Sequence, residues 1–410
     1  MWPLTTPGFI FIKMIMHQDT LSGECVARAP TLVNRYTSTM DIARKRALRV
    51  ASLFSGAGGL DLGFERLLGG KAFHVVWANE YDKTVTPTFR KNFPNTTLVE
   101  GSITDIDSDD LHDGELSLLP SAGPKGAIAG LLGGPPCQSW SEAGARRGSD
   151  DPRGQLFFEY IRILRLLKPA FFLAENVSGI LFERHKDALT RILKEFRLSG
   201  YNVYYTKLNA VDYEVPEDRE RVIFIGFRSD LPLETPFAFP EPVKRKKTLE
   251  VIRKWTSTAR AFDPKRRDPK QNEWMEGGFS PIFLSRNRVR GWDEPSFTIQ
   301  ATARHAPLHP DAGKMVKVGT DKFKFAPGSE KKGLVRRLTV REAAEVQTFP
   351  SNFIFEYSNI VNGYKMVGNA VPVKFAEHLA NAIHEYLSPL APADLIATSK
   401  AKPGKKTKKI

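Results

Sequence analysis

The sequence predicts an α/β protein with a mostly parallel, doubly wound sheet and a second, smaller and irregular domain. Short apolar runs alternate with amphipathic helical stretches through the first half of the chain, which is the order that a parallel sheet requires. The composition then shifts at Pro236 to a proline-containing, basic region with little regular pattern. Helical periodicity returns at residues 338–347, and a last helix is expected at 373–386.

Charge is unevenly distributed along the 410 residues, which carry a net charge of +14. Residues 244–270 hold eleven Lys or Arg against three Asp or Glu, a net charge of +8, and residues 400–410 add six lysines without an acid. Together these two segments equal the whole excess. Such concentrated basicity indicates a polyanionic partner, most simply nucleic acid. The alternative is a solvated loop and a disordered tail.

Composition also excludes several classes of protein. Hydrophobic residues make up 41% and charged residues 26%, the range of a soluble globular protein. Two cysteines cannot form a disulfide framework, and no metal-ligand spacing is present, so a reducing, cytoplasmic setting without a metal is expected. We expect no membrane span and no signal peptide, because no apolar run approaches about 20 residues and the start lacks a basic segment.

The first predicted strand, residues 49–54, runs directly into a glycine turn at 55–59 and then into a helix. A strand, a glycine turn and a helix form a cradle for a nucleotide-like ligand, because glycines allow close approach to the backbone. The full G-x-G-x-x-G fingerprint fails, since its third position is Asp61. A tight connection without a ligand is the alternative.

The next two strands also end in acidic residues. The strand at 73–80 ends in Glu80, 22 residues after Gly58, where such folds place a carboxylate on ribose hydroxyls. A short strand at 97–100 is followed by Asp105. Asp105 is a candidate acceptor for an exocyclic amine, and the alternative is that it caps a helix.

Cys137 follows an apolar run, residues 127–132, that is stopped by two glycines and two prolines. A cysteine just beyond the carboxyl end of a strand lies where open α/β sheets build active sites. A structural cysteine at a tight turn is the alternative. The polar loop at 139–154 is long enough to act as a lid before a helix at 155–167.

The fifth strand, residues 171–177, contains Glu175 near its end, and neighbouring strand ends would place Glu175 near Cys137. A helix at 183–198 and a strand at 201–208 follow. Arg219 and Arg221 then stand at the foot of a strand at 222–227, on one face. Two guanidinium groups suit a carboxylate or phosphate clamp, and solvated surface charge is the alternative.

Six motifs, taken in order, resemble those of the DNA (cytosine-5) methyltransferases, which use S-adenosylmethionine. The resemblance covers about 49–230 and 336–385 and parts of the region between. The motifs are Phe54–Leu60, Gly133–Gln138, Glu175–Val177, Arg219–Arg221, Arg336–Glu342 and Gly368–Pro372. The resemblance implies a Rossmann-like methyltransferase domain at 49–243 and 336–390 and a target-recognition domain at 244–335. Residues 1–48 remain as an extension, and 391–410 are expected to form a basic, disordered tail.

The resemblance also implies roles for individual residues. Cys137 would be the nucleophile, Glu175 would serve N3 of cytosine, and Arg221 and Arg219 would support them. The implied cofactor-site residues are Phe54, Ser55, Gly56, Gly58, Gly59, Leu60, Glu80, Asp105, Ile106, Pro135, Asn369, Ala370 and Val371. The implied partner is duplex DNA with a flipped base. A monomer is expected, with a companion endonuclease that acts on the same site without a stable complex.

The middle region resembles recognition segments of bacterial family members that methylate GGCC. Arginine suits bidentate contact with guanine, and phosphate contact without base reading is the alternative. The expected DNA-binding residues are Ser139, Arg153, Arg286, Arg288, Arg290 and Arg304. Three rival interpretations are a tRNA cytosine methyltransferase, a non-catalytic DNA-binding relative and a nicotinamide-dependent oxidoreductase. The recognition segment argues against the tRNA enzyme, and the intact Cys137 argues against the non-catalytic relative. The broken fingerprint at Asp61 argues against the oxidoreductase.

Overall fold

A computed structural model describes residues 47–107, 111, 128–136, 152–328, 335–391 and 394–395, and side chains are not described at 152–154. The predicted extension up to residue 46, Cys137 and Ser139 lie outside the described residues, as does nearly all of the basic tail.

One seven-stranded sheet organises the described chain, in the order β3-β2-β1-β4-β5-β8-β6. The first five of these strands are parallel, and β8 and β6 are antiparallel to their neighbours. This confirms the mostly parallel α/β sheet. The strands are β1 (Leu48–Leu53), β2 (Phe73–Glu80), β3 (Thr97–Glu100), β4 (Gly130–Gly133), β5 (Phe171–Val177), β6 (Tyr201–Asn209) and β8 (Glu220–Arg228).

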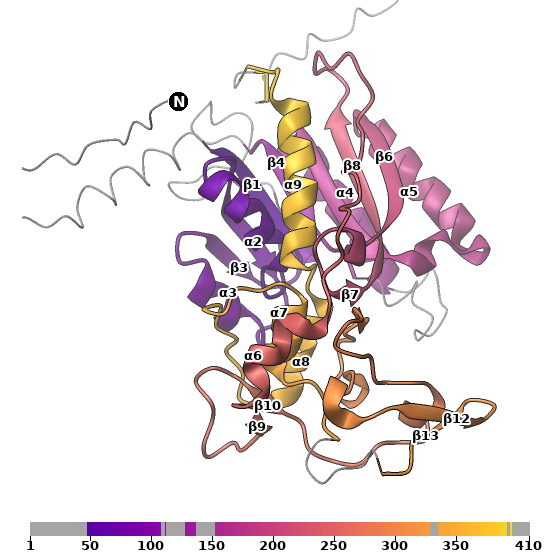
Figure 1. The fold of residues 1–410 in the computed structure, drawn as a ribbon. Helices are drawn as coiled ribbons and strands as arrows, with labels where there is room; N and C mark the ends of the chain where they lie inside the picture. Colours follow the sequence, from indigo (N-terminus) through magenta and orange to yellow (C-terminus); the bar gives the residue numbers. More distant parts are fainter. Residues whose placement is uncertain are drawn as a thin grey trace, which may run out of the picture. The chain divides into compact units, whose positions relative to one another are not determined.

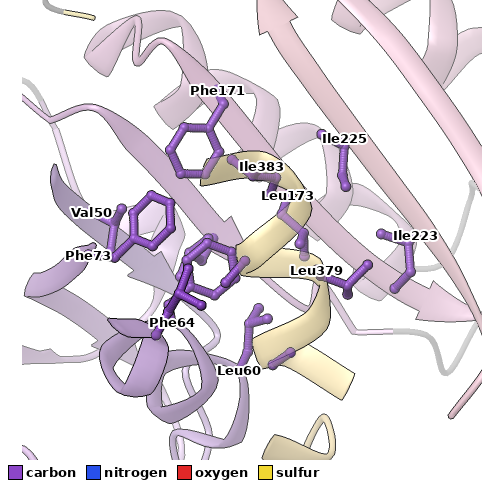
Figure 2. Packing of buried hydrophobic residues seen from close by; sticks show 14 of the residues in the cluster. Val50, Leu60, Phe64, Phe73, Phe171, Leu173, Ile223, Ile225, Leu379 and Ile383 are labelled. Atoms are coloured by element: carbon purple, nitrogen blue, oxygen red, sulfur yellow. The ribbon is translucent and has the colours of Figure 1, made fainter. Parts of the chain in front are cut away.

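Helices cover both faces of the sheet, because its central strands are apolar on both sides. In β5, Phe171 and Leu173 join one hydrophobic cluster, whereas Phe172 and Ala174 join another. The first cluster packs under α2 (Gly59–Arg66) and α9 (Val373–Leu387), as Figure 2 shows for Phe64 and Leu379. The second packs under α4 (Pro152–Leu167) and α5 (Lys186–Leu198). The fold is therefore doubly wound (Figure 1).

The strand order creates a switch point between β1 and β4. From β1 the chain moves outward through β2 to β3, and then returns to the other side of β1 as β4. In open α/β sheets, ligands bind outside the carboxyl ends of the strands at such a point. The glycine turn after β1 and the Gly133–Pro136 turn after β4 therefore meet where a ligand site is expected.

Between β8 and α9 the chain forms mostly short elements, which lie below the sheet in Figure 1. They include α6 (Arg253–Thr256), the hairpin of β12 (Met315–Gly319) and β13 (Lys322–Phe325), and two-residue strands. One of these short strands, β11 (Ser296–Phe297), pairs with β7 (Glu217–Asp218), which directly precedes β8. The helices α7 (Val340–Val346) and α8 (Ile360–Asn369) follow. The remaining short strands are β9 (Arg260–Ala261) and β10 (Glu273–Trp274), and α3 (Thr86–Asn92) precedes β3.

Candidate active site

A cavity of about 610 Å³ opens at the carboxyl ends of the strands that flank the switch point. The glycine turn, the end of β2, the Gly133–Pro136 turn and the end of β5 contribute to its wall. A further part of the wall comes from residues 368–371, at the end of α8 and just after it. The volume lies in the range of small-molecule and cofactor sites.

The turn after β1 requires glycine for two separate reasons. Gly56 and Gly58 have φ values of +55° and +86°, a region that side chains disfavour. A Cβ at Gly58 would also lie 2.2 Å from the Phe93 ring, and one at Gly59 would lie 2.3 Å from the carbonyl oxygen of Val371. The turn is therefore packed closely against α3 and the residues after α8, and its backbone forms the cavity wall.

Glu80 is fixed at the end of β2 by two backbone donors. Gly56 N–H donates to Oε2 at 2.7 Å, and Asp82 N–H donates to Oε1 at 2.8 Å. Burial raises the pKa of Glu80, and these two hydrogen bonds act in the opposite direction. A carboxylate held in this way presents a defined acceptor to hydroxyl groups in the cavity.

Tyr81 is a cavity residue that the sequence analysis missed. Its side chain is 74% exposed although it lines the cavity beside Glu80. A large exposed aromatic ring next to a polar acceptor is suited to stack on a flat ligand ring. The only available signal was its position directly after the acidic end of β2.

Glu175 and Arg221 form an ion pair inside the cavity, with Arg221 Nε 2.7 Å from Glu175 Oε1. The antiparallel pairing of β5 with β8 produces this contact, because it sets Val177 opposite Arg221. Asn176 Nδ2 also donates to the carbonyl oxygen of Pro135 at 3.3 Å. The end of β5 thus carries Glu175 and, through Asn176, also fixes the Gly133–Pro136 turn that precedes Cys137.

Arg219 lies deeper than Arg221, although it also touches the cavity wall. Its guanidinium donates to the carbonyl oxygens of Ile299, Gly368 and Ala370 at 2.9–3.1 Å, and to Glu217 Oε1 at 3.4 Å. Burial and nearby Arg221 lower its pKa to about 10, so it is charged at neutral pH. Arg219 therefore joins the end of α8 to the segment after β11.

Most of the expected cofactor residues line the cavity, and three do not. Those that line the cavity are Phe54, Ser55, Gly56, Gly59, Leu60, Glu80, Pro135, Asn369, Ala370 and Val371. Gly58 shapes the turn from behind. Asp105 is exposed and accepts a hydrogen bond from Thr104 Oγ1, and Ile106 is buried, whereas their neighbours Ser102 and Ile103 reach the cavity wall.

The expected DNA-binding arginines differ in how they are held. Arg286 and Arg304 are exposed, and no ion pair holds either within the described residues. Arg288 donates to the carbonyl oxygen of Phe283 at 2.9 Å, and Arg290 Nη1 lies 2.9 Å from Glu294 Oε1. Arg153 lies in α4, and its side chain is outside the described part.

The described residues contain neither a metal-binding cluster nor a membrane-spanning helix. No group of three or more His, Cys, Asp or Glu side chains there could hold a metal ion. No helix in the same ranges is long and apolar enough to cross a membrane.

The fold and cavity define a Rossmann-like α/β protein in which a paired acid and arginine line a cavity of cofactor size. The C-5 cytosine-specific DNA methylase family matches residues 48–385. The chain therefore belongs to this family, as a DNA methyltransferase of the Type II restriction-modification kind. Methyltransferases of this family generally use S-adenosylmethionine.

Similar proteins agree with this assignment. The Type II methyltransferase M.NgoPII of Neisseria gonorrhoeae is 50% identical, and the match covers 83% of this chain and 96% of that protein. M.FnuDI of Fusobacterium nucleatum is 46% identical, over 83% and 95% of the two chains. The solved structure of the methyltransferase EhMeth of Entamoeba histolytica shares the fold, with a TM-score of 0.58 and 17% identity, over 83% and 99%.

Proposed function

We propose that the protein transfers a methyl group from S-adenosylmethionine to C5 of a flipped cytosine in duplex DNA. The observation that carries this proposal is the Glu175–Arg221 pair in the same cavity as Glu80 and the glycine turn. A cofactor site and a cytosine site must adjoin for a methyl group to pass between them.

The residues of the cavity fit the cofactor. Glu80 would accept the ribose hydroxyls, Tyr81 would stack on the adenine, and the glycine turn and residues 369–371 would enclose the rest. When bound, S-adenosylmethionine supplies an electrophilic methyl group on a sulfonium. Asp105, although outside the cavity wall, and Ile106 remain candidates for its adenine end.

The chemistry at cytosine needs a nucleophile, because C5 is unreactive by itself. The Cys137 thiolate would add to C6, and Glu175 would supply a hydrogen bond or proton at N3 as charge builds in the ring. C5 then takes the methyl group, a base removes the C5 proton, and the C6–S bond breaks. Arg221 would hold Glu175, and Arg219 would hold the surrounding backbone.

We further propose that residues 244–335 form the target-recognition domain and that the target is the inner cytosine of GGCC. Arg286, Arg288, Arg290 and Arg304 are the candidate contacts, and Ser139 and Arg153 would hold the DNA near the flipped base. The protein would act as a cytoplasmic monomer on DNA. A companion endonuclease would act on the same site without a stable complex.

A duplex with 5-fluorocytosine at the target tests the chemistry, because fluorine at C5 prevents the final proton loss. With S-adenosylmethionine present, the wild-type protein should become covalently attached to this duplex. The Cys137→Ala variant should bind the duplex without attachment. Attachment in the variant would reject Cys137 as the nucleophile, and transfer to tRNA but not to duplex DNA would reject the substrate.

A further inference from the structure

Asp61 is a buried acidic residue that the proposed chemistry does not use. It lies in the first turn of α2, directly behind the glycine turn, and its side chain is 0% exposed. It nevertheless belongs to the cavity wall, together with Ser52 of β1, which is 1% exposed. Both residues are almost fully buried where they meet the cavity.

Within the described residues, neither carboxylate oxygen of Asp61 has a hydrogen-bond partner. The Ser52 hydroxyl is close enough to lower the pKa of Asp61, yet no hydrogen bond of standard geometry joins the two side chains. Burial of an unpaired carboxylate is unfavourable. Such a group is retained at a cavity wall when a ligand supplies the missing partner.

Nearby charge makes a cation the fitting partner. Glu65 and Glu80 both raise the pKa of Asp61, so this end of the cavity is negative. Glu65 is already occupied, since it accepts from Val75 N–H at 2.8 Å and contacts His74 Nδ1 at 2.7 Å. Glu80 is held by Gly56 and Asp82. Of these three carboxylates, Asp61 is the one without a partner among the described residues.

We propose that Asp61, assisted by Ser52, is the subsite for the α-ammonium group of the amino-acid part of the cofactor. This assignment rests on the proposed function, in which Glu80 takes the ribose. A ligand with its ribose at Glu80 would extend past the glycine turn towards α2, and its amino-acid end carries a primary ammonium group. The carboxylate would form a charge-assisted hydrogen bond with that group in a largely dry environment.

Titration calorimetry at pH 8 with three ligands measures how much the amino-acid part of the cofactor contributes to binding. The ligands are S-adenosylmethionine, S-adenosylhomocysteine and 5′-methylthioadenosine, which lacks the amino-acid part. The Asp61→Asn variant should bind the first two at least about tenfold more weakly, as expected for a hydrogen bond to a charged group. It should bind 5′-methylthioadenosine within about twofold of wild type.

Two matched variants serve as controls. Glu80→Gln should weaken all three ligands alike, because each contains the ribose. Glu65→Gln removes a neighbouring charge that does not line the cavity, so it should weaken the two amino-acid-containing ligands far less than Asp61→Asn does and leave 5′-methylthioadenosine binding unchanged. A melting temperature of Asp61→Asn at or above that of wild type would show that weaker binding does not come from misfolding.

Several results would overturn the assignment. Equal loss for 5′-methylthioadenosine would mean that Asp61 only shapes the site, and unchanged binding of all ligands would remove its role. Loss for S-adenosylmethionine alone would assign Asp61 to the sulfonium instead. If the wild-type protein binds none of the three, the proposed function itself fails and this assignment fails with it.

Discussion

At the scale of single residues, the site contains side chains whose burial opposes stability. Asp61 is the clearest case, because a helix first-turn acid is normally exposed and favourable, whereas this one is buried without a partner among the described residues. Glu80 and Glu175 are only partly buried, and each is held by named donors. Unfavourable burial at one end of a cavity is typical of a site that is completed by its ligand.

The pH dependence of stability follows from Asp61. Burial raises its pKa from 3.8 to about 7. Between these values the folded protein keeps a proton that the unfolded chain has lost, so this group makes stability fall as the pH rises from about 4 to 7. Asp61→Asn should therefore gain stability over wild type through that window, reaching on the order of 4 kcal/mol above pH 7.

Urea unfolding of the ligand-free protein at pH 5 and pH 8 measures this difference. A gain that is larger at pH 8 supports the prediction. A variant that is less stable than wild type at both pH values would instead mean that the carboxylate stabilises the start of α2.

At the scale of elements, Arg219 lies just before β8 and Arg221 lies within it, yet the two side chains contact different parts of the molecule. Arg219 binds the backbone of the segments at 299 and 368–370, and Arg221 binds Glu175 in the cavity. Gly368 allows this arrangement, since a Cβ there would lie 2.3 Å from the carbonyl oxygen of Gln300. The segment after β11 is thus packed directly against the end of α8, which lines the cavity.

This arrangement predicts different outcomes for the two alanine variants. Arg219→Ala removes three hydrogen bonds to backbone carbonyl groups and the ion-pair partner of buried Glu217, which keeps the Ile299 N–H. It should therefore lose about 3–5 kcal/mol of unfolding free energy. Arg221→Ala should lose much less stability, because its partner lies in the cavity, and should lose turnover instead. Urea unfolding and methyl-transfer rates of both variants check this. Equal stability losses would contradict the separation of roles.

Much of this organisation could be predicted from the sequence. Strands such as Phe73–Glu80 and Phe171–Val177 were located because buried parallel strands are short, apolar and punctuated by turn residues. The helix at 183–198 begins at Lys186 instead, because residues 183–185 form a 3₁₀ turn, and β4 begins at Gly130. The helix α8 was not predicted, since Asn362 and Gly363 weaken its local propensity.

The remainder depends on tertiary structure. No local pattern indicates that β8 pairs between β5 and β6, and it is this pairing that brings Arg221 to Glu175. From the sequence, Asp61 is only the residue that breaks the dinucleotide fingerprint. Its burial could not be predicted, because burial of a single carboxylate leaves no periodic signal. Glu217 was missed for the same reason.

At the scale of the whole molecule, specificity should come from the arginines that the fold leaves exposed. Arg304→Ala and Arg286→Ala should each relax discrimination at one base pair by about 1–3 kcal/mol if they read guanine. Arg253→Ala is the control, because Arg253 is not a candidate contact and its guanidinium already pairs with Glu250 and covers the Trp292 ring. It should lose stability more than specificity.

Methylation rates on a set of duplexes with single substitutions in GGCC measure this discrimination. Uniform loss of rate on every duplex, with a shallower salt dependence, would show that Arg286 and Arg304 hold phosphates and do not read bases.

The most direct test of the account is base-resolution mapping of 5-methylcytosine in DNA from cells that express the protein, with Cys137→Ala as the control. We predict methylation at C5 of the inner cytosine of GGCC in the wild-type sample and none in the control. Methylation at another short motif would reject the target while leaving the enzyme class intact. Absence of new 5-methylcytosine at every site, from folded protein, would contradict the central claim.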